Sequence, residues 1–449
     1  MPDKEGKKIK RRRYLASVGI GLFGGCSTLS NTSNTPTPTT QRSPTPTQTA
    51  TSSMTPTETE SPTDERSTTT MNKDWDGGWP MRGYDLGNTG YNHVSNSVTG
   101  PTRQWGTAVD GYYTLPTPAV KGASIFVGSD TKLYAIHRTR GYKQWTVDLN
   151  YLTHFFTPAV KNGIVYAAAR DPGGATVGSS SRGVLGAIDA TTGEFIWKKQ
   201  PFISSSPKVA NETLYYTAST AKGGYLRARN ISDGSRKWSY RFGNSSTPSF
   251  SSGTPALGDG IIYATGNVGK YESATGRVVA INRQTQQPRW TGTVNGKIES
   301  GPVVHGDGVY VGATSGKVIR FAKSSGIKEW EYTIGDSVYS KLSMDRSAVY
   351  ALTDGQIHAI DATNGQQIWK RSIGSTHYST VSVTKDVVYV GGTNMYGFSK
   401  DGQQLWRKEV DGYSGAFGGP AIANGILYLG ACIKHEQSSL YDNYMYRMT

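Results

Sequence analysis

The sequence predicts an all-β protein built from repeated blades, and three observations lead to this prediction. First, the chain of 449 residues contains 55 Gly and 27 Tyr, with 35% hydrophobic but only 18% charged residues. That balance suits many short strands joined by turns. Second, an aromatic residue ends a β-rich run eight times in one register. Third, a tryptophan ends a second β-rich run eight times, at the close of each repeat.

The first half of each repeat reads as a β-hairpin. In "PAVKNGIVY" (158–166) and "PAIANGILY" (420–428), two short strands are joined by Asn-Gly. This pair supplies the two residues with positive φ that a tight hairpin turn requires. The aromatic residues that end the second strand are Phe126, Tyr166, Tyr215, Tyr263, Tyr310, Tyr350, Tyr389 and Tyr428. In six repeats the first strand is preceded by Pro, which costs little hydrogen bonding at a strand start.

The second half of each repeat is a further hairpin that ends on tryptophan. The eight tryptophans are Trp105, Trp145, Trp197, Trp238, Trp290, Trp330, Trp369 and Trp406. A Gly stands four residues before six of them, whereas Pro101 and Gln286 hold that place before Trp105 and Trp290. Because a Trp side chain buries a large apolar area, we expect these residues to pack between neighbouring blades in a structural role.

Four antiparallel strands in each of several repeats are typical of β-propeller blades. The series of hairpin aromatics and the series of tryptophans are out of phase along the chain. Trp105 precedes the first aromatic hairpin, and no such Trp follows the last one. The strand around Trp105 therefore supplies the outer strand of the last blade and removes both open sheet edges. The sequence predicts an eight-bladed propeller of four-stranded antiparallel blades over residues 73–449, with the ring closed by this N-terminal strand.

Residues 1–25 predict a lipoprotein signal peptide of the twin-arginine type. The basic stretch "KKIKRRRY" precedes a short apolar run and Cys26. Arg11 and Arg12 are the expected arginine pair, and "LFGGC" resembles a lipobox in which Cys26 is lipidated. The chain has no apolar run of 18 residues, so no transmembrane helix is predicted.

Residues 26–72 are composed mainly of Thr, Ser, Pro, Asn and Gln, so they predict a disordered stalk. With the signal, this stalk predicts a protein that is anchored to the outer side of the cytoplasmic membrane, at the cell surface. We expect the protein to be a monomer. The formal net charge is +15, and residues 1–25 hold seven Lys or Arg against two Asp or Glu. The remaining basic residues are scattered, which argues against nucleic acid as a partner.

The repeats resemble those of the eight-bladed quinoprotein-type propellers. "AIDATTGEFIW" (187–197) and "AIDATNGQQIW" (359–369) approximate the docking motif A-x-D-x-x-T-G-x-x-x-W of that family. "WPMRGYDLGNTG" (79–90) resembles the segment that precedes the propeller in many members. The resemblance implies two kinds of function: cofactor-free scaffolds such as the lipoprotein BamB, and dehydrogenases that use pyrroloquinoline quinone (PQQ) with calcium.

The residues favour the scaffold branch over the dehydrogenases. Those enzymes carry adjacent cysteines beside the quinone, whereas this chain has only Cys26 and Cys432. The seven His residues show no metal-ligand spacing, and we expect no metal site, no cofactor and no catalytic residues. The expected function is a lipid-anchored binding or scaffold propeller for a protein or glycan partner. The alternative is a PQQ-dependent dehydrogenase of alcohols or sugars.

A binding face is predicted where each outer strand links to the next inner strand. Seven of these eight links carry an aromatic residue within polar Ser, Gly and Asn sequence, a composition that suits adaptable recognition surfaces. The residues are Tyr113, Phe156, Phe202, Phe250, Tyr339, Tyr378, Tyr413 and Phe417. A second interpretation stays open, in which these aromatics fill the central channel or pad the blade entrances.

Overall fold

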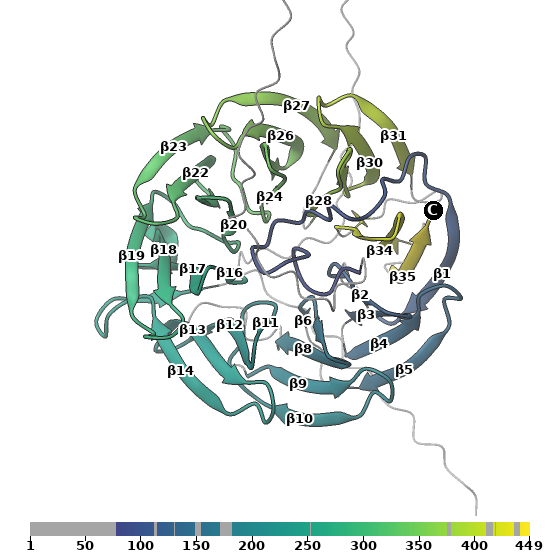
Figure 1. Cartoon of the computed structure of the whole chain (residues 1–449), viewed down its shortest axis with the longest axis horizontal. Coiled ribbons are helices and arrows are strands. Elements are labelled where there is room, and N and C mark those ends of the chain that lie inside the picture. The colour runs from purple at the N-terminus through teal and green to yellow at the C-terminus, as the bar shows by residue number, and fades with distance from the viewer. Residues whose placement is uncertain are drawn as a thin grey trace, which may run out of the picture.

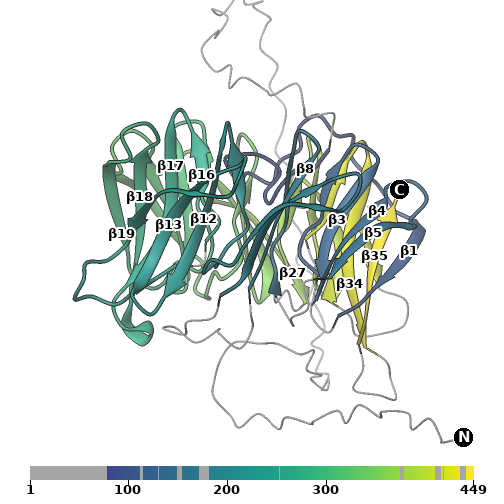
Figure 2. The same cartoon turned by 90° about the horizontal axis from the view of Figure 1, so that it is seen from below.

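The predicted eight-bladed, all-β ring is confirmed. The computed structural model describes residues 78–449 except for 112–114, 130, 149–153, 171–181, 252, 375–378, 410–415, 418 and 435–440. Eight antiparallel sheets surround a central axis (Figure 1). Figure 2, turned by 90°, shows that the sheets stand side by side and that the ring has two faces. Three of the sheets carry a fifth, two-residue strand.

The strands of the first four blades follow one another from the axis outward. Blade 1 contains β2 (Ala119–Lys121), β3 (Ser124–Ser129), β4 (Lys132–His137) and β5 (Lys143–Asp148). Blade 2 contains β7 (Ala159–Lys161), β8 (Ile164–Arg170), β9 (Val184–Asp189) and β10 (Phe195–Lys199), with β6 (His154–Phe155) beside β8. Blade 3 contains β11 (Lys208–Ala210), β12 (Thr213–Thr220), β13 (Gly223–Asn230) and β14 (Arg236–Arg241). Blade 4 contains β16 (Ala256–Gly258), β17 (Ile261–Val268), β18 (Thr275–Asn282) and β19 (Pro288–Val294), with β15 (Ser249–Phe250) beside β17 and the 3-10 helix η2 (Tyr271–Ser273) between β17 and β18.

The last four blades have the same order. Blade 5 contains β20 (Val303–His305), β21 (Gly308–Ala313), β22 (Lys317–Ala322) and β23 (Lys328–Thr333). Blade 6 contains β24 (Ser343–Met344), β25 (Ala348–Thr353), β26 (Gly355–Asp361) and β27 (Gln367–Gly374). Blade 7 contains β28 (Val381–Val383), β29 (Val387–Val390), β30 (Asn394–Ser399) and β31 (Gln404–Glu409). Blade 8 contains β33 (Ala421–Ala423), β34 (Ile426–Lys434), β35 (Tyr441–Met448) and β1 (Arg103–Val109), with β32 (Ala416–Phe417) beside β34.

The inner hairpins form because the turn chemistry and the strand pattern agree. In blade 2, Asn162 (φ 49°) and Gly163 (φ 72°) take the left-handed conformations of the turn between β7 and β8. The resulting register pairs Ala159 with Tyr166, whose side chain is 1% exposed. A small residue on the innermost strand thus leaves room for the aromatic ring beside it.

The N-terminal strand closes the ring, as the phase of the repeats predicts. β1 pairs antiparallel with β35, and Trp105 lies opposite Arg447. The pairing continues beyond β35, because the amides of Thr102 and Thr449 each donate to the other residue's carbonyl, at 2.8 and 3.0 Å. Figure 1 shows β1 outside β35 and next to blade 1. The last blade therefore obtains its outer strand only when β1 pairs with β35.

The tryptophans at the repeat ends join each blade to the next. In blade 6, the Trp369 ring lies 6.0 Å from the Tyr350 ring of its own blade, and its Nε1 donates to the Lys400 carbonyl of blade 7 at 2.7 Å. Gly402 of blade 7 lies so close to the indole that a Cβ there would meet it at 2.6 Å. Seven of the eight tryptophans donate in this way to a turn of the next blade: Trp105 to Thr139, Trp145 to Ala190, Trp197 to Ile231, Trp290 to Lys323, Trp330 to Ala362, Trp369 to Lys400 and Trp406 to Val98.

This arrangement predicts a large cost for removing a seated indole. Replacement of Trp369, which is 5% exposed, by Ala should lower the free energy of unfolding by about 3–5 kcal/mol, since it leaves a cavity between blades. The matched control is Ile368→Ala on the same strand, whose side chain is 48% exposed and should change stability by about 0.5 kcal/mol or less. Chemical denaturation measures both values, and equal effects would contradict the seating of the indole.

Candidate functional site

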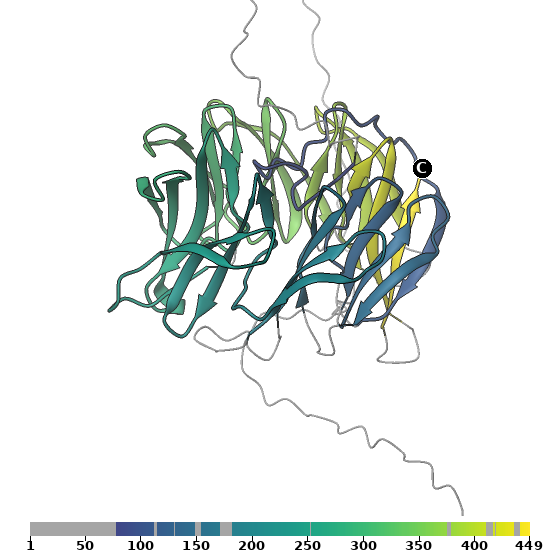
Figure 3. The same ribbon diagram turned by 60° about the horizontal axis from the view of Figure 1, so that its bottom comes forward.

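The axis of the ring is occupied by the chain itself. Residues 78–98, which we call the axial segment, cross one end of the ring at its centre (Figures 1 and 3). The inner strands of six blades donate a backbone N–H to this segment at 2.8 Å: Val120 to Trp79, Val160 to Pro80, Leu257 to Leu86, Val304 to Gly87, Met344 to Thr89 and Val383 to Gly90. Lys208 of blade 3 donates its ammonium to the Arg82 carbonyl at 2.6 Å, and Asn92 donates its amide to the Ile422 carbonyl of blade 8 at 2.7 Å. The segment thus bonds all eight blades in order.

The axial segment packs closely against the backbone of the inner strands. The Asn88 amide nitrogen lies 3.0–3.2 Å from the carbonyls of Thr254, Pro255 and Pro302, which belong to two neighbouring blades. A Cβ at Gly87 would lie 2.4 Å from the Val304 oxygen, so only glycine fits there. The segment lies on the side of the turns that follow the inner strands, because Ser95 bonds the Gly425 amide in such a turn. The links between blades enter the inner strands at the opposite end.

Three basic side chains converge at the axis, and we call Arg82, Lys208 and Lys341 the axial cation cluster. Lys208 is fully buried and Lys341 is 5% exposed. Burial lowers the pKa of Lys208 to about 7, which Asp85 opposes and Arg82 reinforces. Burial also lowers the pKa of Lys341 well below its usual value, and Arg82 and Lys208 lower it further while Asp85 raises it. This end of the axis therefore disfavours a bound cation.

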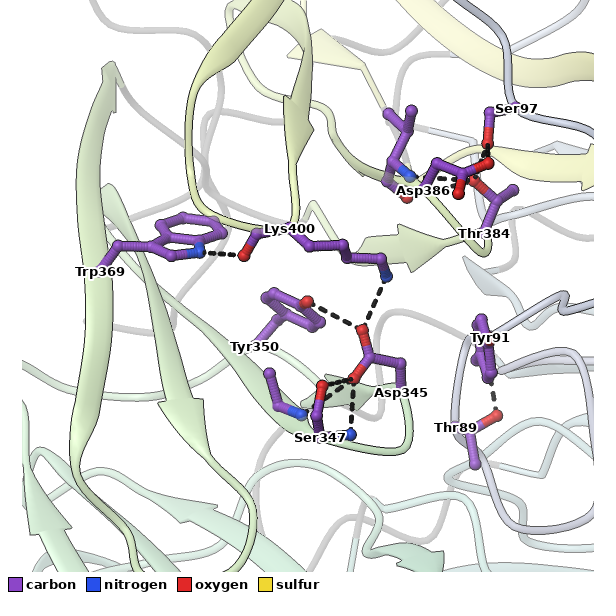
Figure 4. A network of polar contacts seen from close by, with 12 residues as sticks. Thr89, Tyr91, Ser97, Asp345, Ser347, Tyr350, Trp369, Thr384, Asp386 and Lys400 are labelled. Atoms are coloured by element: carbon purple, nitrogen blue, oxygen red, sulfur yellow. Dashed lines mark hydrogen bonds and ion pairs between the residues drawn. The ribbon is translucent and has the colours of Figure 1, made fainter. Parts of the chain in front are cut away.

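A second polar network joins blades 6 and 7 (Figure 4). The Asp345 carboxylate accepts from the amides of Ser347 and Ala348, from the Tyr350 hydroxyl at 3.0 Å and from the Lys400 ammonium at 2.7 Å. Burial alone would raise the pKa of Asp345, but the Lys400 charge and these donors outweigh it and lower the pKa. Lys400 also lies 5.6 Å from the Tyr91 ring centroid of the axial segment. Because donors surround this carboxylate, we assign it a structural role between blades.

The aromatic residues of the predicted link face differ in exposure, and some of them lie outside the described residues. Tyr113, Tyr378 and Tyr413 lie outside the described residues, and so do Arg11, Arg12 and Cys26. Phe417 belongs to the short strand β32. Phe156 and Phe202 are half-buried against the core between blades 2 and 3, Phe250 is 5% exposed, and Tyr339 is 49% exposed. Among the members whose side chains are described, Tyr339 is therefore the one available for contact.

Sequence reasoning missed the axial cation cluster, although the repeat itself carried a signal. The residue after the proline of the inner hairpin is Ala at positions 119, 159, 256 and 421, whereas it is Lys208 in blade 3. A charged side chain at a place that points to the axis is a departure from the repeat. It became interpretable only when the structure placed Arg82 and Lys341 beside it.

Acidic, histidine and cysteine side chains do not gather into a metal-binding group among the described residues. No three His, Cys, Asp or Glu side chains of the described residues converge to hold a metal ion. The adjacent cysteines that the resemblance implies for a quinone site are absent from the sequence. Over the ranges of the chain that the structure describes, no helix has the length and the apolar character that a membrane span requires.

The axial cation cluster predicts a pH-dependent stability to which Lys341 contributes and which Lys341→Met therefore reduces. An unfolded Lys has a pKa of about 10.4, and the folded state lowers the pKa of Lys341. Below pH 10 the unfolded state therefore binds more protons, and stability rises as the pH increases toward 10. The Lys341→Met variant should be more stable than the natural chain at pH 7.5, by a margin that shrinks at pH 10.

Denaturant titrations at the two pH values measure this margin. Lys222→Met, at an exposed lysine, is the control and should give a difference that does not depend on pH. A Lys341→Met chain that is less stable than the natural one at pH 7.5, or a margin that is the same at both pH values, would contradict the assignment.

Comparison with known proteins places the chain in a family. A curated relative, the outer membrane protein assembly factor BamB of Yersinia pestis, is 28% identical over 261 residues, which cover 52% of this chain and 62% of the relative. BamB from Moraxella catarrhalis matches in structure with a TM-score of 0.56 and 17% identity, covering 77% of this chain and 99% of that one. The quinohemoprotein alcohol dehydrogenase from Comamonas testosteroni matches with a TM-score of 0.64 and 14% identity, covering 83% and 80%. The two structural matches show the shared fold.

The match to a family model shows to which family the chain belongs. The model described as outer membrane protein assembly factor BamB matches residues 129–272, 265–396 and 353–446, which together span well over half of the chain. This range contains the complete repeats of blades 2 to 7 with their hairpins and their terminal tryptophans. The chain therefore belongs to the family of PQQ-like repeat propellers that this model represents.

Proposed function

We propose that this protein is an exported, membrane-anchored propeller that works without a cofactor as a scaffold for a protein partner. The match to the family model and to an assembly factor carries the proposal. The predicted signal, with Arg11, Arg12 and Cys26, supports its place at the outer side of the cytoplasmic membrane. The relative is named for the outer membrane, whereas the membrane proposed for this chain is inferred from its own signal sequence.

The geometry favours a binding protein over an enzyme. The axial segment fills one end of the axis with backbone that already bonds eight blades. The seated tryptophans connect seven junctions, which gives a stiff ring whose links are free to vary. Function on such a scaffold concentrates in the loops.

The link face is the surface that we assign to the partner. Tyr339 lies in the link between blades 5 and 6, and its half-exposed ring offers rigid contact area at a small entropic cost. Ile327, 67% exposed, lies immediately before the outer strand of blade 5 and so at the other end of the ring. These two positions let an experiment distinguish the two faces.

Cross-linking on intact cells tests the assignment of the face. A photoreactive side chain at position 339 should trap a discrete protein adduct, whereas the same side chain at position 327 should trap little. Adducts from both positions in equal yield would contradict a specific link face. The dehydrogenase alternative is tested separately with purified protein, by titration with PQQ and calcium and by an assay of dye reduction with alcohols and sugars.

Tyr339→Ser should separate partner capture from folding. Because Tyr339 is half-exposed, its loss should change the free energy of unfolding by about 0.5 kcal/mol or less while it weakens capture of the cross-linked partner. Phe250→Ser, at a side chain 5% exposed and 5.3 Å from the Tyr271 ring, should cost about 3 kcal/mol or more. A large drop in the melting temperature of the Tyr339→Ser variant would place this residue in the core.

Export and anchoring are tested at the N-terminus. Lys in place of both Arg11 and Arg12 should leave the precursor in the cytoplasm, because the paired arginines are the expected export signal. Cys26→Ser should release the exported protein from the membrane, because the thiol is the expected site of lipidation. Fractionation with an antibody to the propeller measures both outcomes. Membrane retention of a processed Cys26→Ser protein would contradict the lipid anchor.

A further inference from the structure

The junction between blades 3 and 4 departs from the other seven. Trp238 ends its repeat in β14 at the usual place, and its ring lies 6.1 Å from the Tyr215 ring of its own blade. Its indole N–H, however, has no hydrogen-bond partner among the described residues, whereas the other seven tryptophans donate to the next blade. By the spacing of the repeat, the expected acceptor is the carbonyl of Arg283 or Gln284. The Trp238 side chain is half-buried, as are those of Trp105, Trp145 and Trp330, so it differs from them in its hydrogen bonding and not in its exposure.

The turn of blade 4 next to Trp238 also lacks the glycine that six other junctions carry. At six junctions, a Cβ on this glycine would lie 2.5–2.8 Å from the indole, so these six turns approach the indole more closely than a side chain there would allow. At the junction of blades 7 and 8, Pro101 holds this place and the Trp406 indole donates to the Val98 carbonyl at 3.2 Å. At the junction of blades 3 and 4 this place is held by Gln286, at φ 62°. Gln286 and Trp238 face the same space between the two blades. An open pocket of about 440 Å³ takes the place of the contact.

The pocket combines an aromatic surface with cations and neutral hydrogen-bonding groups. Its lining includes Trp238, Tyr215, Arg283, Lys237, Asn211 and Gln286, and none of the described lining residues is acidic. Among the described residues, the Arg283 guanidinium has neither an ion pair nor a hydrogen bond. The Lys237 ammonium donates to the Thr213 hydroxyl at 2.9 Å and to the Glu212 carbonyl at 3.2 Å, which keeps it at the rim.

We propose that this pocket binds an acidic sugar, such as a uronic acid residue of a glycan. The sugar ring would lie against Trp238, whose N–H is available to a ring hydroxyl. Its carboxylate would pair with Arg283, because a guanidinium presents paired donors to a carboxylate. The amides of Asn211 and Gln286 both donate and accept, as hydroxyl groups require. The volume lies within the range of ordinary ligand sites.

The chemistry distinguishes this ligand from simpler ones. An inorganic anion would use Arg283 and Lys237 but would leave the aromatic wall without a contact. A neutral sugar would use the indole and the amides but would leave the guanidinium without its counter-charge. The site is independent of the partner on the link face, because Trp238 and Gln286 lie on the outer strand of blade 3 and the outer turn of blade 4.

Calorimetric titration of the exported chain tests the proposal with three probes: trigalacturonate, a neutral galactose trisaccharide and inorganic phosphate. Trigalacturonate should bind at least about tenfold more tightly than the neutral trisaccharide, a difference of about 1.4 kcal/mol, and phosphate should compete weakly. Equal affinity for the neutral sugar would overturn the acidic specificity. Full competition by phosphate would reduce the site to an adventitious ion only and would also overturn the proposal.

Two variants then locate the ligand. Gln286→Gly restores the glycine of the repeat, so it should seat Trp238, raise the melting temperature and abolish trigalacturonate binding. Arg283→Met should weaken binding of trigalacturonate by at least about tenfold without that rise in stability. Arg289→Met, at an exposed arginine of β19 outside the pocket lining, is the matched control and should bind as the natural chain does. Unchanged affinity in both pocket variants would overturn the assignment.

Discussion

The contact on which the ring depends is the indole of one blade seated on the turn of the next. It couples an aromatic pair within a blade, such as Tyr350 with Trp369, to a hydrogen bond and a close approach across the junction. A twisted four-stranded sheet has two faces to cover, and a neighbouring blade covers each of them. The apolar clusters accordingly join residues of neighbouring blades, as between blades 6 and 7. Closure by β1 extends this to the junction of blades 8 and 1.

The axial segment adds a second constraint, at the centre of the ring instead of at its rim. The tryptophans connect neighbours around the rim, whereas residues 78–98 connect all the inner strands at the centre. Because this segment carries Arg82 into a space already lined by Lys208 and Lys341, it also concentrates positive charge there, which the charge of Asp85 opposes. The same backbone that closes the axis therefore makes its interior electrostatically costly. Such a cost is tolerated where many other contacts hold the group in place.

Departures from the repeat are more informative than the repeat itself. Lys208 replaces a small residue at the axis and Gln286 replaces a glycine at the rim. In each place a local property goes with the new residue: burial lowers the affinity of the Lys208 amine for a proton, and Gln286 lines an open pocket together with the Trp238 indole. No departure from the repeat indicates that Tyr339 is exposed, because the exposure of a residue in a link depends on how the neighbouring links pack.

The sequence by itself determined the number of blades, the strand order within each blade and the closure by the strand around Trp105, because these follow from local periodicity and from the phase of two repeats. It did not determine which link aromatics are exposed: Phe250 is buried while Tyr339 is open. Nor did it indicate that Arg82, Lys208 and Lys341 meet, or that Trp238 lines a pocket. Only the tertiary structure decided these points, because burial and charge depend on groups brought together from distant blades.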